Sequence, residues 1–240
     1  MARKIKLAKR VVAESDRLAS RLRARFAAAR VFVANLMSSP GSGKTSLLEH
    51  TARRLAGELR MAVIEGDLAT DRDACRIRAA GIPSYQINTG GGCHLSARQI
   101  IDALEEFDLA ALDVLFIENV GNLVCPAEFD LGERRRVVLV STPEGDDKPV
   151  KYPVAFHKAD CVVLNKIDLL AATNFSRDAF VAYVRGLAPS VPILELSCRS
   201  GQGLDGWLDW VRNERELWIG DCELWIENER QLRGRAPRRR

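Results

Sequence analysis

Short apolar runs alternate along the chain with longer stretches in which apolar residues recur every three or four positions. The apolar runs occupy residues 31–37, 61–65, 84–88, 113–118, 136–141, 160–164 and 192–197. Each run has the length of one buried strand, and the stretches between the runs have the periodicity of amphipathic helices. This alternation predicts an α/β fold, in which helices flank a doubly wound, mostly parallel sheet with its ligand site at the carboxyl ends of the strands.

A glycine-rich loop joins the first apolar run to the helical stretch that follows it. Residues 38–45 read Ser-Ser-Pro-Gly-Ser-Gly-Lys-Thr. Backbone amides near Gly41 and Gly43 can surround phosphate oxygens, because no Cβ blocks their approach. In such a loop Lys44 provides a charge for the β- and γ-phosphates, and the Thr45 hydroxyl can bind Mg²⁺. The loop departs from the usual G-x-x-x-x-G-K-S/T pattern at its first position, yet it predicts a P-loop NTPase.

A second motif indicates which base is bound. Residues 165–168 read Asn-Lys-Ile-Asp and directly follow an apolar run. The Asp168 carboxylate can accept hydrogen bonds from N1–H and the N2 amine of guanine, whereas adenine has no such pair of donors. Residues 197–203, Ser-Cys-Arg-Ser-Gly-Gln-Gly, follow another strand-like run, and their backbone can close over guanine O6. The two motifs together predict a GTPase.

Two acidic residues lie near the ends of strand-like runs, beside the predicted phosphate site. Asp67 follows the run at 61–65, and Glu118 ends the run at 113–118. A carboxylate at this edge of a parallel sheet can hold Mg²⁺ or its water ligands. Gly121 lets the backbone approach a γ-phosphate closely, as in the switch loops of GTPases. The alternative for Glu118 is an ordinary polar residue at a strand end.

These motifs give three sets of candidate residues. Catalytic roles are assigned to Lys44, Asp67 and Glu118, and magnesium ligation is assigned to Thr45, Asp67 and Glu118. The expected contacts with GTP come from Ser39, Pro40, Gly41, Ser42, Gly43, Lys44, Thr45, Ser46, Gly121, Asn165, Lys166, Asp168, Ser197, Cys198 and Arg199.

Several further motifs occur in one order and carry a resemblance to a known family. They read Glu-Gly-Asp at 65–67, Gln-Ile-Asn-Thr-Gly at 86–90, Gly-Cys-His-Leu at 92–95, Glu-Asn-Val-Gly-Asn-Leu-Val-Cys-Pro at 118–126, Glu-Gly-Asp-Asp-Lys-Pro at 144–149 and Lys-Tyr-Pro at 151–153. From about residue 14 to about residue 212, the chain resembles the HypB family of hydrogenase nickel-incorporation GTPases. The urease counterparts are expected to carry a Cys-Pro-His element, which this sequence lacks. Ser96 stands where many HypB proteins have aspartate.

The resemblance implies a nickel or zinc site formed by Cys93, His94 and Cys125. Thiolate and imidazole are ligands that suit Ni²⁺ and Zn²⁺. Three protein ligands leave one position for water or for a partner's ligand, as expected for a metal that is passed on. The alternative is that Cys125 is a small buried apolar residue and His94 a hydrogen-bonded polar one.

The composition bears on the compartment. The remaining cysteines, which show no ligand spacing, are Cys75, Cys161, Cys198 and Cys222. Without a signal peptide or a C-x-x-C pair, the six cysteines predict reduced thiols in the cytoplasm. No apolar run is long enough to span a membrane, so no membrane partner is expected.

The basic residues are concentrated at the two ends of the chain. Residues 1–30 hold ten Lys or Arg and two acidic residues, and residues 233–240 hold five Arg, so the overall charge of +4 leaves −9 on the remainder. We expect a basic amphipathic N-terminal helix at 1–30, a GTPase domain with the metal site at 31–217, and a C-terminal extension with a basic, disordered tail at 218–240. Because Phe26 is the only aromatic residue among these charges, a solvated helix face is favoured over nucleic-acid binding.

The resemblance implies a GTP-hydrolysing metallochaperone that delivers nickel for maturation of nickel–iron hydrogenase, with GTP, Mg²⁺ and Ni²⁺ or Zn²⁺ as ligands. The implied partners are a second copy of the chain in a nucleotide-dependent homodimer, a HypA-like nickel chaperone and the precursor of the hydrogenase large subunit. Some family members carry an N-terminal cysteine motif or histidine-rich stretch, but residues 1–30 contain neither residue type. The alternatives are a nickel or zinc carrier in which nucleotide only controls dimerisation, and a urease-type nickel-insertion GTPase.

Overall fold

Seven parallel strands form a single sheet in the order β3-β2-β4-β1-β5-β6-β7. The computed structural model describes the backbone of residues 2–67 and 72–234, and the side chains of residues 13–66 and 75–224. The strands are β1 (Phe32–Ser38), β2 (Met61–Asp67), β3 (Ser84–Asn88), β4 (Val114–Gly121), β5 (Arg135–Ser141), β6 (Cys161–Asn165) and β7 (Ile193–Glu195). The predicted doubly wound parallel sheet is confirmed, and β1, which leads into the glycine-rich loop, lies at its centre.

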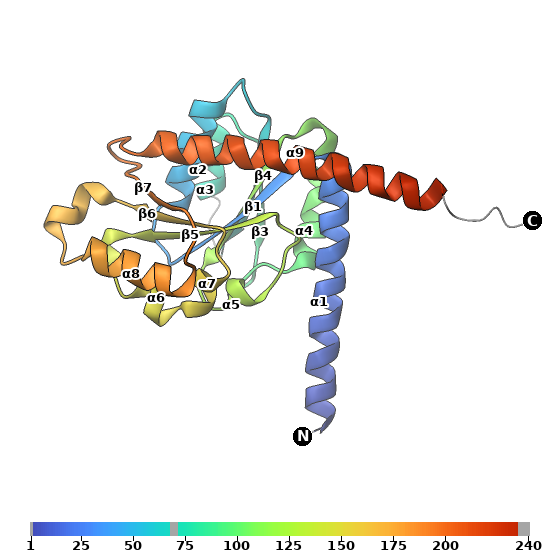
Figure 1. Ribbon diagram of the computed structural model, residues 1–240, viewed down its shortest axis with the longest axis horizontal. Helices are drawn as coiled ribbons and strands as arrows, with labels where there is room; N and C mark the ends of the chain where they lie inside the picture. The colour runs from blue at the N-terminus through green and yellow to red at the C-terminus, as the bar shows by residue number, and fades with distance from the viewer. Residues whose placement is uncertain (1, 68–71, 235–240) are drawn as a thin grey trace, which may run out of the picture.

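Helices cover both faces of the sheet (Figure 1). One face is covered by α2 (Lys44–Leu55), α3 (Arg72–Ala79) and α9 (Leu204–Gly234). The other face carries α1 (Ala2–Ala29), α4 (Ala97–Ala103), α5 (Cys125–Glu128), α7 (Pro153–His157) and α8 (Arg177–Leu187). Shorter elements connect these, namely α6 (Lys148–Lys151), η1 (Leu104–Glu106), η2 (Leu109–Ala111), η3 (Thr142–Glu144) and η4 (Ile167–Ala172).

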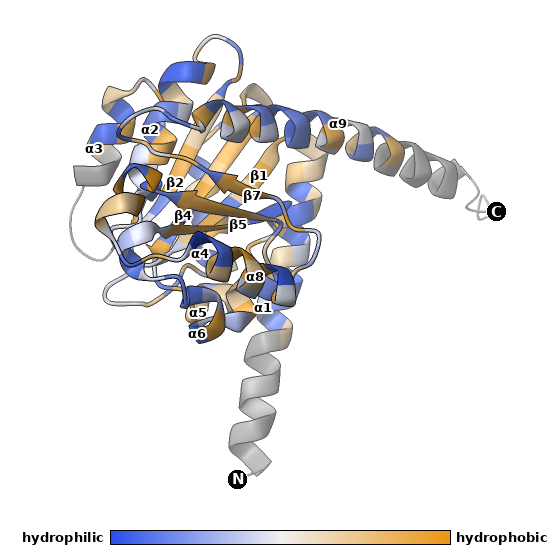
Figure 2. Cartoon of the chain, turned by 60° about the vertical axis from the view of Figure 1, so that its left-hand side comes forward, coloured by the Kyte–Doolittle hydropathy of each residue, from blue (hydrophilic) through white to orange (hydrophobic). Residues whose placement is uncertain are grey.

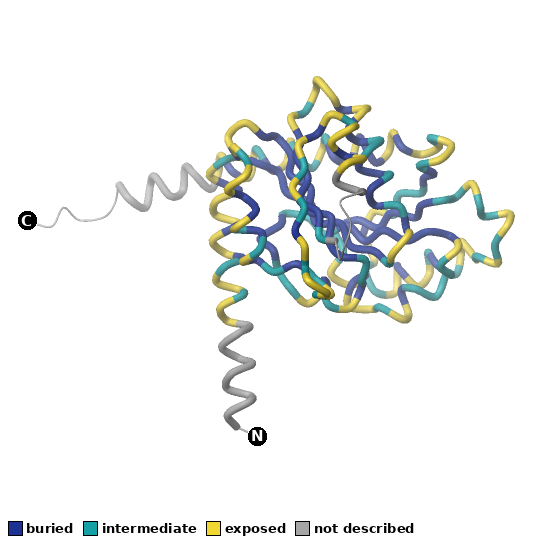
Figure 3. Tube along the Cα trace, turned by 180° about the vertical axis from the view of Figure 1, so that it is seen from behind, coloured by how far each residue is buried: buried dark blue, intermediate teal, exposed yellow. Residues whose placement is uncertain are grey.

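The strands are apolar on both faces because helices cover both (Figure 2). Successive residues of β1 therefore join different clusters: Phe32 packs beneath α2 and α9, and Val33 packs beneath α1 and α4. The strands form a buried interior, with exposed residues gathered on the outer helices and loops (Figure 3). No helix among the described residues combines the length and apolar composition needed to cross a membrane.

Helix α9 packs through a group of tryptophans. The rings of Trp207 and Trp210 stack with centroids 5.2 Å apart, and the Trp207 Nε1–H donates a 2.8 Å hydrogen bond to Thr51 Oγ1 of α2. Trp218 is also buried. The expected boundary between residues 217 and 218 thus falls within one continuous helix, whereas the tail at 235–240 lies outside the described residues.

Two local features could not be read from the hydropathy pattern, namely the end of β4 and the N-cap of α4. Strand β4 does not end at Glu118 but continues to Gly121, because it pairs with Ser38 after a shift in register. Ser96 caps α4, with its hydroxyl accepting from the Gln99 amide in a capping box. Serine and aspartate are equally good N-caps, so the substitution preserves the start of this helix.

Candidate nucleotide and metal sites

The glycine-rich loop connects the end of β1 to the first turn of α2. Gly41 and Gly43 have φ angles of +77° and +101°, a left-handed conformation that glycine adopts without strain. A Cβ on Gly43 would also collide with the side-chain amide of Asn165. The conformation and the space therefore both require glycine where phosphate oxygens would meet the N-terminus of α2.

The cationic and hydroxyl groups of the loop are buried and held by specific partners. Lys44 Nζ donates to Ser38 Oγ over 2.8 Å, and Thr45 Oγ1 donates to Glu118 Oε1 over 2.9 Å. Ser38, the residue that departs from the P-loop pattern, therefore orients the lysine. Lys44, Thr45, Glu118 and Gly121 line one pocket at the carboxyl edge of the sheet, together with Pro40, Gly41 and Gly43.

The candidate magnesium ligands are brought together in part. Thr45 and Glu118 are hydrogen-bonded neighbours, and a hydroxyl beside a carboxylate is a donor set that suits Mg²⁺. Asp67 ends β2, but its side chain lies outside the described residues. Glu65, which received no role from the sequence, is buried, lines the same pocket and pairs with Glu118 across β2 and β4.

The candidate base-recognition residues surround a second pocket next to the candidate phosphate site. Its lining includes Gly43, Ser46, Asn165, Lys166, Asp168, Cys198 and Arg199. The Asn165 side chain donates to the Ser42 carbonyl over 2.9 Å and accepts from the Cys198 amide over 3.2 Å. Ser197 Oγ donates to Asp168 Oδ1 over 2.6 Å, which orients the carboxylate. Asn165 thus links the loops that would hold the phosphates and the base.

Glu144 and Lys148 contact the P-loop, although the sequence identified them only as part of a family motif. Ser42 Oγ donates to Glu144 Oε1 over 2.6 Å, and Lys148 Nζ donates to Ser39 Oγ over 2.8 Å. Burial alone would raise the pKa of Glu144, but hydrogen bonds from Ser42 and Ser141 outweigh it, so the pKa is lowered. The charged pair therefore fixes two serines of the loop.

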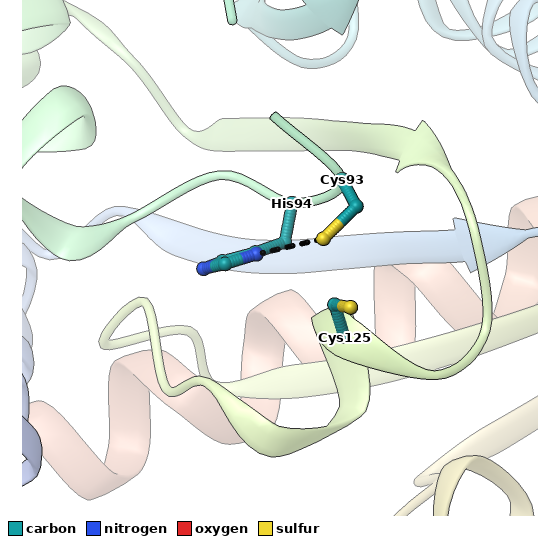
Figure 4. A group of neighbouring side chains, drawn as sticks. All are labelled: Cys93, His94 and Cys125. Atoms are coloured by element: carbon teal, nitrogen blue, oxygen red, sulfur yellow. Dashed lines mark hydrogen bonds between the residues drawn. The ribbon is translucent and has the colours of Figure 1, made fainter. Parts of the chain in front are cut away.

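The candidate metal ligands converge from two segments (Figure 4). Cys93 and His94 lie in the loop between β3 and α4, and Cys125 begins α5. The ligand atoms all lie within 4.8 Å of one another, and Cys93 Sγ is 3.5 Å from His94 Nδ1. No other cysteine among the described side chains belongs to this group. The arrangement brings two thiols and one imidazole together at a partly exposed site.

Nearby groups shift the protonation of these ligands. The hydrogen bond with Cys125, followed by burial, raises the pKa of Cys93, and burial lowers the pKa of His94. The His94 ring stacks on Phe129, with centroids 4.0 Å apart. A neutral imidazole held flat in this way presents a lone pair for coordination, and metal binding would displace the thiol protons.

Comparisons with known proteins agree with this geometry. The CobW/HypB/UreG nucleotide-binding domain family matches residues 32–195. The hydrogenase maturation factor HypB of Azotobacter vinelandii is 50% identical over 214 residues, which cover 89% of this chain and 71% of that protein. The crystal structure of HypB from Archaeoglobus fulgidus is 39% identical, with a TM-score of 0.80, and covers 85% of this chain and 99% of its own.

A second crystal structure, HypB from Helicobacter pylori in complex with nickel, has the same identity of 39% and TM-score of 0.80, and covers 85% of this chain and 95% of its own. The family match runs from β1 to β7 and thus includes the first pocket and all three candidate metal ligands, and it ends just before Cys198 and Arg199 of the second pocket. The resemblance seen in the sequence is confirmed, and the chain belongs to the HypB family of hydrogenase maturation factors, within the CobW/HypB/UreG group of nucleotide-binding domains.

Proposed function

We propose that the chain is a GTP-hydrolysing metallochaperone that delivers nickel for maturation of nickel–iron hydrogenase. The observation that carries the proposal is that one segment, residues 118–125, serves both sites. At one end Glu118 lines the phosphate pocket, and at the other end Cys125 approaches Cys93 and His94. The relatives support the nature of the cargo, because they are hydrogenase maturation factors and the Helicobacter pylori protein was crystallised with nickel.

GTP hydrolysis is assigned to the pocket at the carboxyl edge of the sheet. Asp168 selects guanine, backbone amides of the P-loop hold the phosphates, and Lys44 neutralises charge on the β- and γ-phosphate oxygens. Thr45 and Glu118, with Asp67, would hold Mg²⁺, which supplies further charge neutralisation at those oxygens. Hydrogen bonds to Lys148 and Glu144 hold Ser39 and Ser42 in place, and so maintain the conformation of the P-loop.

Nickel is the cargo rather than a permanent part of the protein. Cys93, His94 and Cys125 supply three ligands, so one coordination position remains for a ligand from the donor or the acceptor. Cys93 is exposed, and the other two ligands are half-buried, so a partner can reach the metal. The same ligands suit Zn²⁺. We propose Ni²⁺ as the delivered metal because the related Helicobacter pylori protein was crystallised in complex with nickel.

The proposed partners follow from the need of a metallochaperone to receive nickel from one protein and to deliver it to another. A HypA-like nickel chaperone and the precursor of the hydrogenase large subunit are the expected donor and acceptor. GTP binding would drive the chain into a homodimer, and reduced thiols at the metal site suit a cytoplasmic location. GTP hydrolysis would then accompany the change from the nickel-loaded state to the nickel-free state.

A single-turnover experiment tests the proposal. The nickel-loaded chain is mixed with GTP or a non-hydrolysable analogue, and both phosphate release and nickel transfer to an acceptor are followed, with Lys44→Ala as the comparison. We expect nickel transfer to follow hydrolysis in the wild type and to be absent with the analogue. Equal transfer with GTP and the analogue would instead favour a carrier in which nucleotide controls only dimerisation.

A further inference from the structure

Two asparagines, one in β4 and one directly after it, bind the backbone on either side of His94. The Leu95 amide donates to Asn119 Oδ1 over 3.2 Å, and Asn122 Nδ2 donates to the Cys93 carbonyl over 3.1 Å. Both asparagines belong to the segment that follows Glu118. The loop that carries two candidate metal ligands is therefore hydrogen-bonded directly to the segment that lines the phosphate pocket.

Asn119 is fixed in one orientation by its other partners. It is 1% exposed, and its Oδ1 also accepts from the Val120 amide over 3.0 Å. Its Nδ2 donates to Asn35 Oδ1 over 3.2 Å, and Asn35 in turn donates to Glu133 over 3.3 Å. A buried amide whose oxygen accepts two hydrogen bonds and whose nitrogen donates one is held in this orientation on its strand. Any movement of β4 at Asn119 is thus passed to the Leu95 amide.

The loop also rests on β2, the strand that ends at Asp67. A Cβ on Gly66 would lie 2.8 Å from Leu95 Cγ, so the two residues are in direct contact. Leu95 is fully buried between this strand and Asn119. The residue after His94 is therefore held by both strands that carry the candidate magnesium carboxylates.

Asn122 joins the two halves of the metal site through one side chain. Its Nδ2 binds the Cys93 carbonyl, and its Oδ1 accepts from the Val124 amide over 2.9 Å, immediately before Cys125. The relative position of the two cysteines therefore depends on this amide. The sequence showed both asparagines within a family motif, but these contacts span 24 and 29 residues and no local pattern signals them.

We propose that Asn119 and Asn122 are positioning residues that transmit the nucleotide state of the phosphate pocket to Cys93, His94 and Cys125. The inference rests on the proposed function and assigns its coupling to two side chains. A shift of residues 118–122 when the γ-phosphate is present moves the Cys93 and Leu95 backbones, and so changes the separation of the thiolates. Metal affinity then differs between the GDP and GTP forms.

Asn122 is the residue to test, because it is half-buried, whereas removal of the Asn119 side chain leaves buried partners unsatisfied and destabilises the fold. Asn122→Asp keeps the acceptor for the Val124 amide but replaces the donor to the Cys93 carbonyl with a carboxylate oxygen, which adds a negative charge near the metal site in both nucleotide forms. Asn122→Ala removes both, and Asn213→Ala changes an exposed asparagine on α9 as the matched control. Ni²⁺ and Zn²⁺ affinities are measured by chelator competition for the GDP and GTP-analogue forms of each protein, with the nickel–thiolate absorption recorded.

The ratio of metal affinities in the two forms is the readout. We expect a ratio of about 5- to 150-fold in the wild type and Asn213→Ala, and a ratio within about twofold of one in both Asn122 variants, with metal still bound in each form. By linkage, the effect of Zn²⁺ on the preference for GTP analogue over GDP must fall by the same factor. A merely structural role lowers both affinities and leaves the ratio unchanged.

A wild-type ratio retained by Asn122→Ala and Asn122→Asp overturns the inference. So does a ratio of one in a wild-type protein that binds metal and hydrolyses GTP, and in that case the proposed function stands. A wild type that fails to bind nickel or to hydrolyse GTP overturns the proposed function, and the inference falls with it.

Discussion

Gly121 lies directly against Pro40, and this contact brings the end of β4 against the P-loop. A Cβ on Gly121 would stand 2.9 Å from Pro40 Cγ and 3.1 Å from the Pro40 nitrogen. The sequence predicted a glycine that admits a γ-phosphate; in the structure, the near neighbour of this glycine is the P-loop itself. A glycine is needed here for space, because its φ angle is not among the positive ones.

Replacing Gly121 should therefore disturb the P-loop. We expect Gly121→Ala to reduce kcat/KM for GTP by about tenfold or more, equivalent to about 1.4 kcal/mol, because the new methyl group displaces Pro40. Steady-state phosphate release measures this. Gly186→Ala is the control, since a Cβ at this position of α8 meets no atom within 4 Å and full activity is expected. Wild-type kinetics for Gly121→Ala would show that the loop relaxes without loss.

The base preference should depend on Asp168. We expect Asp168→Asn to weaken GTP binding by about 3 kcal/mol through loss of a charged pair of hydrogen bonds. The variant should gain affinity for xanthosine triphosphate, because an amide can donate to xanthine O2. Titration with fluorescent nucleotides measures both effects. Equal affinity of the wild type for ATP and GTP would show that Asp168 does not select guanine.

The phosphate pocket should tolerate no loss of its charged groups. Lys44→Ala should abolish turnover, because phosphoryl transfer depends on charge stabilisation at the β- and γ-phosphate oxygens. Glu118→Ala and Asp67→Ala should fail chiefly through weaker Mg²⁺ binding, so part of their activity should return at high Mg²⁺. Turnover measured across a magnesium titration distinguishes the two classes. Wild-type turnover at low Mg²⁺ in either carboxylate variant would remove that residue from the magnesium site.

The metal site should depend on both segments that form it. We expect Cys93→Ala and Cys125→Ala each to weaken Ni²⁺ and Zn²⁺ binding by about tenfold or more, because each removes a thiolate ligand. Cys75→Ala, which changes an exposed cysteine on α3, should bind metal like the wild type. Competition with a chromophoric chelator gives the affinities. Retained binding in Cys125→Ala would restrict the site to Cys93, His94 and groups from elsewhere.

Acid stability should depend on Asp113, the residue directly before β4. Hydrogen bonds from the Arg60 side chain, with further contributions from Arg215, lower its pKa to about 2 from the usual 3.8. A lowered folded-state pKa stabilises the fold above about pH 4, and this contribution of about 2 kcal/mol is lost as the pH falls toward 2. Asp113→Asn should unfold more easily at neutral pH and show a smaller change between pH 4 and 2. Urea unfolding at several pH values measures this. An equal loss of unfolding free energy in both proteins between pH 4 and 2 would contradict the assignment.

Local chemistry and hydropathy were enough to predict the strands of the sheet and to single out the glycine-rich loop and the Asn-Lys-Ile-Asp motif, because each strand and each motif lies within a few consecutive residues. The contact between Ser42 and Glu144 spans 102 residues, so no local pattern could reveal it. The extension of β4 to Gly121 depends on a shifted pairing with Ser38 rather than on hydrophobicity. Cys93 and Cys125 came from the family resemblance, since neither spacing nor composition alone brings two distant thiols together.

Helix α9 carries all four tryptophans of the chain, at positions 207, 210, 218 and 225. Trp207 binds Thr51 on the helix that begins at the P-loop, and Trp210 meets the ring of Phe32 edge-on, with centroids 6.3 Å apart. The tryptophan fluorescence of the protein therefore originates from a single helix. A red shift in tryptophan emission will report water reaching α9 as it leaves the sheet, without any added label, because the helices on the opposite face of the sheet carry no tryptophan.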